Sequence, residues 1–192
     1  MFERTYLAPL LNDVERGHLV AAFFDWLGDR YGQEIEPTRN RACYEFLYDH
    51  AQVLRNQSAC SALLDVGCGP GTILETKLPA LVSLIQGYDI GDEVRQAACA
   101  AGLQVMTVDQ FHDGQGNLPV ALSAYAMHYA CDMDETLKAV ARHLVPGGIW
   151  VMNFHKGINA SLFKARLPGT GLSLVGEPQN SPFGLVLTVM AR

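Results

Sequence analysis

Charge is scarce in this chain of 192 residues, and positive charge is the scarcer of the two signs. Only 18% of the residues are charged, and 14 lysines and arginines stand against 20 acidic residues, for a net charge of -6. Proteins that bind the phosphate backbone of a nucleic acid normally carry a strongly basic surface. We therefore expect no nucleic-acid partner.

Long hydrophobic runs and a secretion signal are also lacking. The apolar stretch from Leu19 to Leu27 is interrupted by Asp25 and falls far short of the roughly 20 residues that span a membrane. The N-terminal residues do not show the basic segment followed by an apolar segment that marks a secretion signal. These absences predict a soluble, cytoplasmic protein with no membrane partner.

Cysteine pairs are missing as well. The chain has 5 cysteines, an odd number, and no two of them form a CxxC pair. The odd count and the absence of a CxxC pair give little support to a disulfide framework or a zinc knuckle, so neither is expected. The histidines form no cluster with ligand spacing either, and we predict no metal site.

What the chain does have is enough apolar sequence, 49% of its residues, to build one compact domain. Residues 1–60 show helical periodicity, with a helix expected at about 38–55. These helices either pack on the core or form a lid over a site built further along the chain. We predict an N-terminal helical lid at 1–60 and a core domain at 61–192.

Strands and helices alternate from residue 61 onward. Strands are expected at 63–66, 84–89, 103–108, 118–124 and 149–154, with helices at 73–83, 93–101 and 133–144. Such alternation predicts a doubly wound α/β fold with a parallel sheet covered on both faces. Two further strands, at 172–175 and 184–190, have no helix between them and predict an antiparallel hairpin at one edge of the sheet.

A glycine-rich loop follows the first strand. Asp65, Gly67, Gly69 and Gly71 alternate there and lead toward a helix. Glycines let the backbone turn tightly and approach a ligand, and ligands bind at the carboxyl ends of the strands in open α/β sheets. The dinucleotide pattern G-x-G-x-x-G would need glycine at position 72, where Thr72 stands.

Two acids follow the next two strands. A carboxylate such as Asp89 can accept both hydroxyls of a ribose, and a second acceptor at Asp109 suits the exocyclic amine of adenine. Both could instead be ordinary turn or capping residues. Their order along the sheet edge predicts a site for a ligand that contains adenosine.

These segments together resemble the class I S-adenosylmethionine-dependent methyltransferases that act on small molecules. The matching motifs are LLDVGCGPGT at 63–72, GYDI at 87–90, VDQ at 108–110, LSAYAMHY at 122–129 and LVPGG at 144–148. The resemblance covers 63–192 and implies a seven-stranded, mostly parallel Rossmann-like sheet whose seventh strand is antiparallel. Pro119 departs from the family, whose members often carry Asp at the start of the fourth strand.

The resemblance also implies a cofactor and the residues that bind it. The cofactor is S-adenosylmethionine, which leaves as S-adenosylhomocysteine. Asp65 would position its amino group, Asp89 the ribose hydroxyls and Asp109 the adenine amine. The implied cofactor-binding residues are Asp65, Gly67, Cys68, Gly69, Gly71, Asp89, Ile90, Asp109, Gln110 and Ser123. Nothing marks Cys68 as a nucleophile.

The sequence says less about which residues contact the methyl acceptor. His128 has a side chain suited to accepting a proton, although a structural role or a substrate contact is equally open, and Tyr125 is the second candidate catalytic residue. Arg39, Arg41, Tyr44 and Tyr48 either close over the methionine carboxylate or serve the core and the surface. The remaining histidines, among them His112 and His155, are expected in solvated loops and at helix ends.

The expected function is methyl transfer to a small molecule by in-line displacement, achieved mainly by positioning. The chain lacks the Asn/Asp-Pro-Pro-aromatic run of adenine methyltransferases and, at Ser123, the acidic metal ligand of catechol-type enzymes. Two alternatives stay open: another reaction of the same cofactor, such as cyclisation or group transfer, or a non-catalytic cofactor-binding subunit. We expect a monomer or a homodimer whose specificity resides before residue 63.

Overall fold

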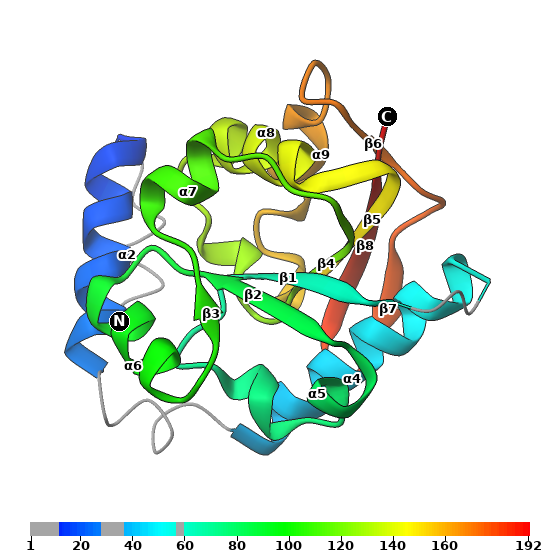
Figure 1. The fold of residues 1–192 in the computed structure, drawn as a ribbon. Helices are drawn as coiled ribbons and strands as arrows, with labels where there is room; N and C mark the ends of the chain where they lie inside the picture. The colour runs from blue at the N-terminus through cyan, green and yellow to red at the C-terminus, as the bar shows by residue number, and fades with distance from the viewer. Residues whose placement is uncertain (1–11, 28–36, 57–59) are drawn as a thin grey trace.

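A single mixed β-sheet forms the centre of the computed structural model, which describes residues 12–27, 37–56 and 60–192 (Figure 1). Two helices precede the sheet, α2 (Asp13–Leu27) and α4 (Pro37–Leu54). The strands are β1 (Ala62–Val66), β2 (Leu84–Tyr88), β3 (Gln104–Val105), β4 (Leu118–Ser123), β5 (Leu144–Phe154), β6 (Leu172–Leu174), β7 (Gln179–Ser181) and β8 (Gly184–Ala191). Between them lie η2 (Thr72–Glu75), α5 (Leu78–Leu81), α6 (Asp92–Ala100), α7 (Val108–Asp113), η3 (Met127–Tyr129), α8 (Met133–His143), η4 (His155–Gly157) and α9 (Ala160–Arg166).

The strand order is β3-β2-β1-β4-β5-β8-β6, which confirms the predicted doubly wound sheet. Strands β1 to β5 pair in parallel, with Leu63 beside Ile85 on one side and Val120 on the other. Strand β8 is antiparallel to both β5 and β6, so the expected antiparallel strand lies next to the edge strand. The short β7 pairs with β8 as an addition to the seven predicted strands.

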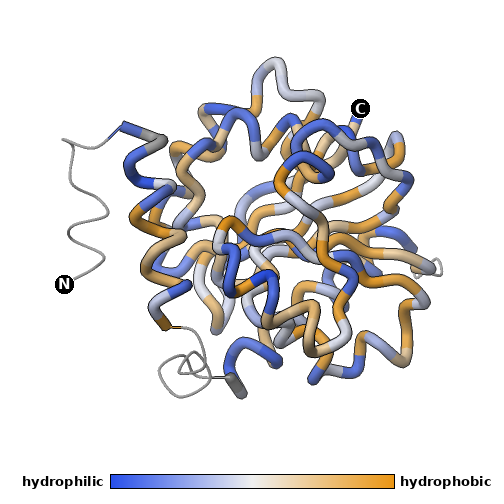
Figure 2. The backbone as a smooth tube through the Cα atoms, turned by 60° about the vertical axis from the view of Figure 1, so that its left-hand side comes forward, coloured by the Kyte–Doolittle hydropathy of each residue, from blue (hydrophilic) through white to orange (hydrophobic). Residues whose placement is uncertain are grey.

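Helices cover both faces of the sheet and bury two apolar clusters. On one face, α7, α8 and α9 pack with large side chains such as Phe111, Leu137 and Phe163 against Trp150 of β5 (Figure 1). On the other face, α4, α5 and α6 cover β1 and β4. Polar and apolar stretches alternate along the chain, as helices with one buried face require (Figure 2).

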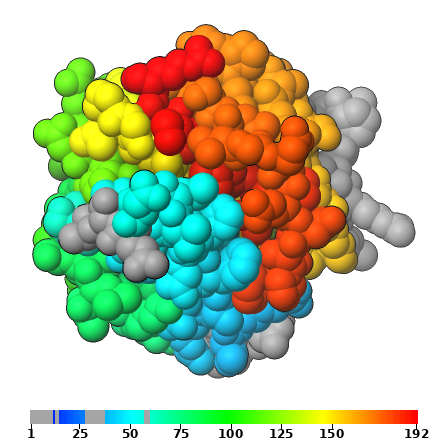
Figure 3. Space-filling model, turned by 90° about the vertical axis from the view of Figure 1, so that its right-hand side faces the viewer, coloured from blue at the N-terminus to red at the C-terminus, as the bar shows by residue number. Residues whose placement is uncertain are grey.

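Helix α4 packs on the sheet beside the C-terminal strands, although the two are far apart in sequence (Figure 3). The rings of Phe46 and Phe183 lie 5.4 Å apart, and His50 contacts the hydroxyl of Thr188. Helix α2 lies apart from α4, next to α6 (Figure 1). The two described N-terminal helices therefore occupy different places, one under the sheet and the other at the edge where its parallel strands end.

Two local predictions differ from the structure. The strand expected at 103–108 is only β3, because Thr107 and Gln110 form a capping box that starts α7 instead. The helix expected at 73–83 is split into η2 and α5, since the Thr76 hydroxyl donates to Ile73 O and accepts from Leu78 N. Within the helical region predicted at 1–60, residues 1–11, 28–36 and 57–59 lie outside the described part of the chain.

Pro119 lies within β4, where the register with β5 shifts between Leu118 and Val120. Proline has no N–H to donate, so it interrupts the ladder at that point. The irregularity falls at the start of the strand, and β4 ends regularly at Ser123. None of the helices within 12–27, 37–56 and 60–192 combines the length and apolar character needed to cross a membrane.

Candidate active site

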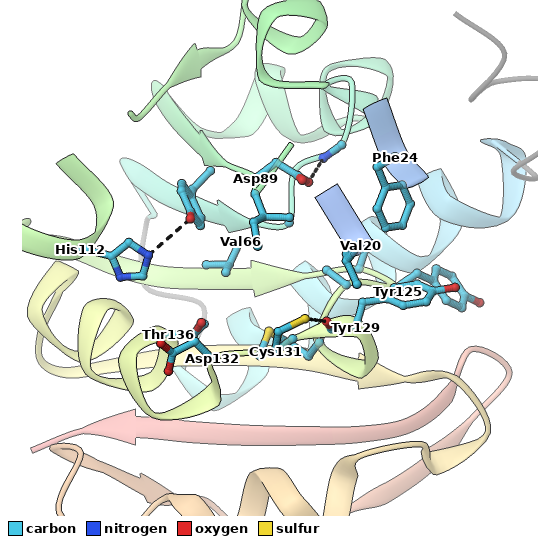
Figure 4. Close-up of a pocket in the computed structure, with 18 residues that line it drawn as sticks. Val20, Phe24, Val66, Asp89, His112, Tyr125, Tyr129, Cys131, Asp132 and Thr136 are labelled. Atoms are coloured by element: carbon cyan, nitrogen blue, oxygen red, sulfur yellow. Dashed lines mark hydrogen bonds between the residues drawn. The ribbon is translucent and has the colours of Figure 1, made fainter. Parts of the chain in front are cut away.

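A cavity of about 140 Å³ opens at the carboxyl ends of β1, β2 and β4 (Figure 4). Its walls come from the glycine loop, the loop after β2, the segment after β4, helix α2 and the ends of α7 and α8. The lining residues are Val20, Phe24, Val66, Gly67, Gly69, Tyr88, Asp89, Ile90, His112, Ala124, Tyr125, Ala126, Met127, Tyr129, Ala130, Cys131, Asp132 and Thr136. His112 and Tyr125 lie at opposite ends (Figure 4).

The glycine loop takes a conformation that side chains disfavour. Gly67 and Gly69 have φ of 80° and 55°, in the left-handed region. A Cβ on Gly67 would overlap the Cβ of Ala126, so the loop and the segment after β4 can approach only because position 67 is glycine. Tyr88 O accepts hydrogen bonds from the N–H groups of Gly67 and Cys68, which fixes the loop against β2.

Asp89 links the end of β2 to this loop. Its Oδ2 accepts the N–H of Gly69 at 2.9 Å, and its Oδ1 accepts the N–H of Gly91 at 3.3 Å. Burial raises the pKa of Asp89, and these backbone hydrogen bonds oppose the shift. A carboxylate offers about four lone-pair positions, so Asp89 can hold the loop and still accept hydroxyl groups from a ligand.

Asp65 lies behind the loop and is fully buried. Tyr44 of α4 donates its hydroxyl to Asp65 Oδ1 at 3.1 Å, while no described residue bonds to Asp65 Oδ2. Burial raises the pKa of Asp65 to about 8; the Tyr44 hydrogen bond lowers it and nearby Asp89 raises it further. A buried carboxyl group with one free oxygen next to the loop is suited to receive a cationic group, whose charge would favour the ionised carboxylate.

Helix α2 forms the outer wall of the cavity. Val20 and Phe24 point into it, and the Phe24 ring meets Tyr129 edge-on at 5.4 Å (Figure 4). Asp25 accepts the N–H of Glu93 at 3.1 Å and so caps α6 from another helix. The helix thereby closes over the loop that carries Asp89.

Tyr125 forms the end of the cavity beyond the glycine loop. Its φ of 56° is unusual for a residue with a side chain, and its N–H donates to Asn153 Oδ1 at 2.7 Å. The buried Asn153 also donates from Nδ2 to Phe183 O at 2.8 Å, and the Tyr125 hydroxyl accepts from Arg39 Nε at 2.9 Å. Helix α4, the segment after β4 and the β7–β8 turn thus meet at one point.

The predicted site residues are not all brought together. Gly67, Gly69, Asp89, Ile90 and Tyr125 line the cavity, whereas the side chains of Asp65 and Ser123 are buried behind it. The Ser123 hydroxyl accepts a hydrogen bond from Trp150 Nε1 inside the core.

Four further predicted residues lie outside the lining. Gly71 packs against α6. Cys68 packs against Gly87, and burial raises the pKa of its thiol well above the usual value. Asp109 and Gln110 belong to the exposed first turn of α7, where Gln110 completes the capping box with Thr107.

His128, the predicted proton acceptor, is also absent from the lining. Only 4% of its surface is exposed, and its Nδ1 has no hydrogen-bond partner among the described residues. Burial, together with the nearby His155, lowers the pKa of His128 to about 4. The imidazole is therefore neutral near pH 7 and a weak base.

Several lining residues were not singled out from the sequence. His112 of α7, with Asp132 and Thr136 at the start of α8, forms the polar end of the cavity, where His112 Nε2 lies 3.4 Å from the Tyr88 hydroxyl (Figure 4). The sequence does mark Asp132 as the start of a helix, because Asp132 and Glu135 have the spacing of a helix cap. In the structure, Asp132 Oδ1 accepts a hydrogen bond from the N–H of Glu135. Nothing in the sequence brings Val20 and Phe24 of α2 to the cavity.

Residues 64–152 match a family profile described as a methyltransferase domain. This segment runs from β1 through β5 and contains the glycine loop, Asp89 and Tyr125. No curated protein matches the sequence significantly.

Solved structures share the fold at low sequence identity. The magnesium protoporphyrin IX methyltransferase of Synechocystis, solved with bound S-adenosylmethionine, is 16% identical with a TM-score of 0.65, covering 96% of this chain and 99% of its own. A sugar N-methyltransferase of a Streptoalloteichus species is 17% identical with a TM-score of 0.66, covering 85% and 91%. A Haloferax volcanii chain in complex with the Trm112 methyltransferase activator is 18% identical with a TM-score of 0.63, covering 88% and 96%.

The cavity fits the cofactor that the motifs imply. Asp89 retains acceptor capacity, Ile90 offers an apolar surface, and the unpartnered Asp65 Oδ2 suits an ammonium group. The ordered motifs, the strand order of the sheet and the matched domain agree with one another. Residues 64–152 thus form a methyltransferase domain of the S-adenosylmethionine-dependent kind, within a chain that has the Rossmann-like fold of the methyltransferase structures named above.

Proposed function

We propose that the enzyme methylates a small molecule and that it does so mainly by holding donor and acceptor in line. The observation that supports this proposal most directly is the small cavity whose walls are largely apolar, with Asp89 tied to the glycine loop at one side. Such a cavity suits a small acceptor better than a polymer, and a net charge of -6 disfavours nucleic acid.

S-adenosylmethionine supplies the electrophilic methyl group when bound. On the side of the protein, we propose that Gly67, Gly69, Asp89 and Ile90 bind its adenosine part and that Asp65 receives its amino group. Tyr125 lines the end where the acceptor would enter, so we assign it an acceptor contact. His128, buried and with a lowered pKa, is assigned a structural role.

We further propose that α2 is the lid of the site, while α4 belongs to the layer that supports the sheet. Val20 and Phe24 cover the cavity, and Asp25 ties α2 to α6. A lid that excludes water favours displacement at a sulfonium carbon, since water is a competing nucleophile. Monomeric or homodimeric assembly stays a prediction.

The test has a binding arm and a chemical arm. Calorimetry should detect S-adenosylhomocysteine binding to the parent protein, lost by at least about 100-fold in Asp89→Ala and retained in Asp134→Ala, which removes an acid of α8 paired with Arg166. Methyl-labelled S-adenosylmethionine, incubated with a small-molecule extract or with RNA, should label only the small molecules. Methylthioadenosine as the product would instead indicate another reaction of this cofactor.

A further inference from the structure

Arg39, near the start of α4, is held at the Tyr125 end of the cavity by two uncharged groups. Its Nε donates to the Tyr125 hydroxyl at 2.9 Å, and its Nη2 donates to Pro182 O at 3.2 Å. The guanidinium carbon also lies 5.9 Å from the centroid of the Tyr125 ring. These contacts fix the orientation of the guanidinium group and leave its charge unneutralised.

Several basic side chains in the described part of the chain have acidic partners. Arg41, two residues along the same helix, pairs with Glu75, and salt bridges likewise join Lys77 to Asp49 and Arg166 to Asp134. No carboxylate within the described residues lies at ion-pair distance from Arg39. A guanidinium carries five N–H donors in a planar fork that matches a carboxylate, and Arg39 uses two of its nitrogens for the contacts above.

Arg39 is exposed and is not one of the lining residues, and its contact with the Tyr125 hydroxyl places it beside the acceptor end of the cavity. The contacts of α4 with the cofactor side are made by other residues, since Tyr44 reaches Asp65 and Arg41 reaches Glu75 just after the glycine loop. Arg39 instead contacts the segment after β4 and the β7–β8 turn. The far end of the cavity, with His112, lies on the opposite side (Figure 4).

The loop after β5 adds basic groups to the same place. The His155 ring lies 6.0 Å from the Tyr125 ring, and Lys156 follows it with an exposed side chain and a φ of 52°. Lys156 has no acidic partner among the described residues either. A chain with a net charge of -6 thus places Arg39 and His155 beside one cavity-lining tyrosine, with Lys156 next to His155 in sequence.

We propose that Arg39 binds a carboxylate of the methyl acceptor, so that the enzyme acts on small carboxylic acids. This inference rests on the proposed small-molecule methyltransferase function. A carboxylate on Arg39 would lie against Tyr125, and Asn153, by fixing the Tyr125 backbone, positions the contact. With its carboxylate bound to Arg39, the rest of the acceptor would extend into the cavity.

The experiment uses the full chain saturated with S-adenosylhomocysteine, titrated with acetate and benzoate and with acetamide and benzamide as uncharged counterparts. Chemical shifts in nuclear magnetic resonance spectra report the binding. We expect at least one acid to bind at least about tenfold more tightly than its amide. Arg39→Gln should abolish that preference, Arg39→Lys should keep part of it, and Arg41→Gln, the matched control, should keep all of it.

The outcomes that overturn the proposal are separate from a failure of the proposed function. A parent protein that does not bind S-adenosylhomocysteine contradicts the function itself. A loaded protein that shows no preference for either acid, or an unchanged preference in Arg39→Gln, contradicts the carboxylate site. If Arg39→Gln weakens S-adenosylhomocysteine but not methylthioadenosine, which lacks the carboxylate, Arg39 serves the cofactor and the proposal is wrong.

Discussion

The two ends of the cavity are built in different ways. At the cofactor end, Gly67, Gly69 and Asp89 lie within 22 residues of one another, and backbone N–H groups make the decisive contacts. At the acceptor end, Arg39 reaches Tyr125 across 86 residues of sequence, and Asn153 joins Tyr125 to Phe183. One end depends on the shape of the backbone, and the other depends on the side chains of Arg39, Tyr125 and Asn153, which come from three separate segments.

Because of this difference, we expect substitutions to have different effects at the two ends of the cavity. A backbone-built end tolerates few changes, because a left-handed glycine has no substitute of equal shape. An end built from side chains can change its hydrogen-bonding groups while the sheet beneath it stays intact. We therefore expect specificity for the acceptor to change more easily than cofactor binding.

The strongest test of the cofactor end is Gly67→Ala. The added Cβ would overlap Ala126 and force an alanine to φ of 80°, so we expect a loss of at least about 4 kcal/mol in the free energy of unfolding. Urea unfolding measures this loss. Gly102→Ala, at φ of 100° but with no atom within 4 Å of the new Cβ, separates backbone strain from overlap. Equal losses in the two variants would contradict the packing argument, and Ala126→Gly added to Gly67→Ala should recover stability.

A second test concerns the buried carboxyl group behind the loop. The pKa of Asp65 is about 8 in the folded protein and near the usual value of about 4 when unfolded. Between these two values the unfolded state has lost the proton that the folded state keeps, so stability falls as pH rises from about 4 to about 8. Urea unfolding at pH 5 and pH 8.5 should show a decrease of a few kcal/mol that Asp65→Asn lacks. Parallel pH dependence in the two proteins would show that Asp65 is ionised when folded.

The acceptor end is tested by Asn153→Ala. Removing this side chain leaves Tyr125 N–H and Phe183 O without their partner, which should cost about 1–3 kcal/mol of stability. Binding of S-adenosylhomocysteine should change by less than about threefold, since the cofactor end makes its own contacts. The exposed Asn180→Ala in β7 serves as the control for stability. A tenfold loss of cofactor affinity in Asn153→Ala would show that the two ends are not independent.

The smallest effect is expected for Asp109→Ala. The side chain is exposed in the first turn of α7 and contributes to that helix about 0.3–1 kcal/mol through the helix dipole. Calorimetry should find the affinity for S-adenosylhomocysteine within about twofold of the parent. A tenfold loss would instead support the sequence-based assignment of Asp109 to the adenine amine.

The fold could be predicted because its main signals are local and repeated. Each strand from 63 to 154 ends in a turn or a helix start, and the parallel order follows from that alternation. The errors came from side chains that compete with the regular pattern. Thr107 and Gln110 cap a helix where the apolar run indicates a strand, and Thr76 divides a helix that periodicity alone would continue.

The site could be predicted only in part, for a related reason. Gly67, Gly69 and Asp89 directly follow β1 and β2, so their spacing in the sequence already indicates that they lie at the cavity. Phe24 lines the cavity and Arg39 contacts Tyr125 only because helices α2 and α4 pack where they do in the folded protein. Local sequence patterns do not determine that packing. Periodicity marks a face of a helix as buried and leaves open which part of the molecule buries it.

The cap that Asp25 places on α6 has a thermodynamic consequence for ligand exchange. Helix α2 is at once a wall of the cavity and a segment docked through one carboxylate and a few apolar contacts. A ligand that contacts Val20 and Phe24 stabilises the packing of α2 against the rest of the protein. By thermodynamic linkage, a change that stabilises this packing also increases the affinity for the ligand. Hydrogen exchange in α2 should therefore slow in proportion to occupancy, which makes this helix a reporter of the site it covers.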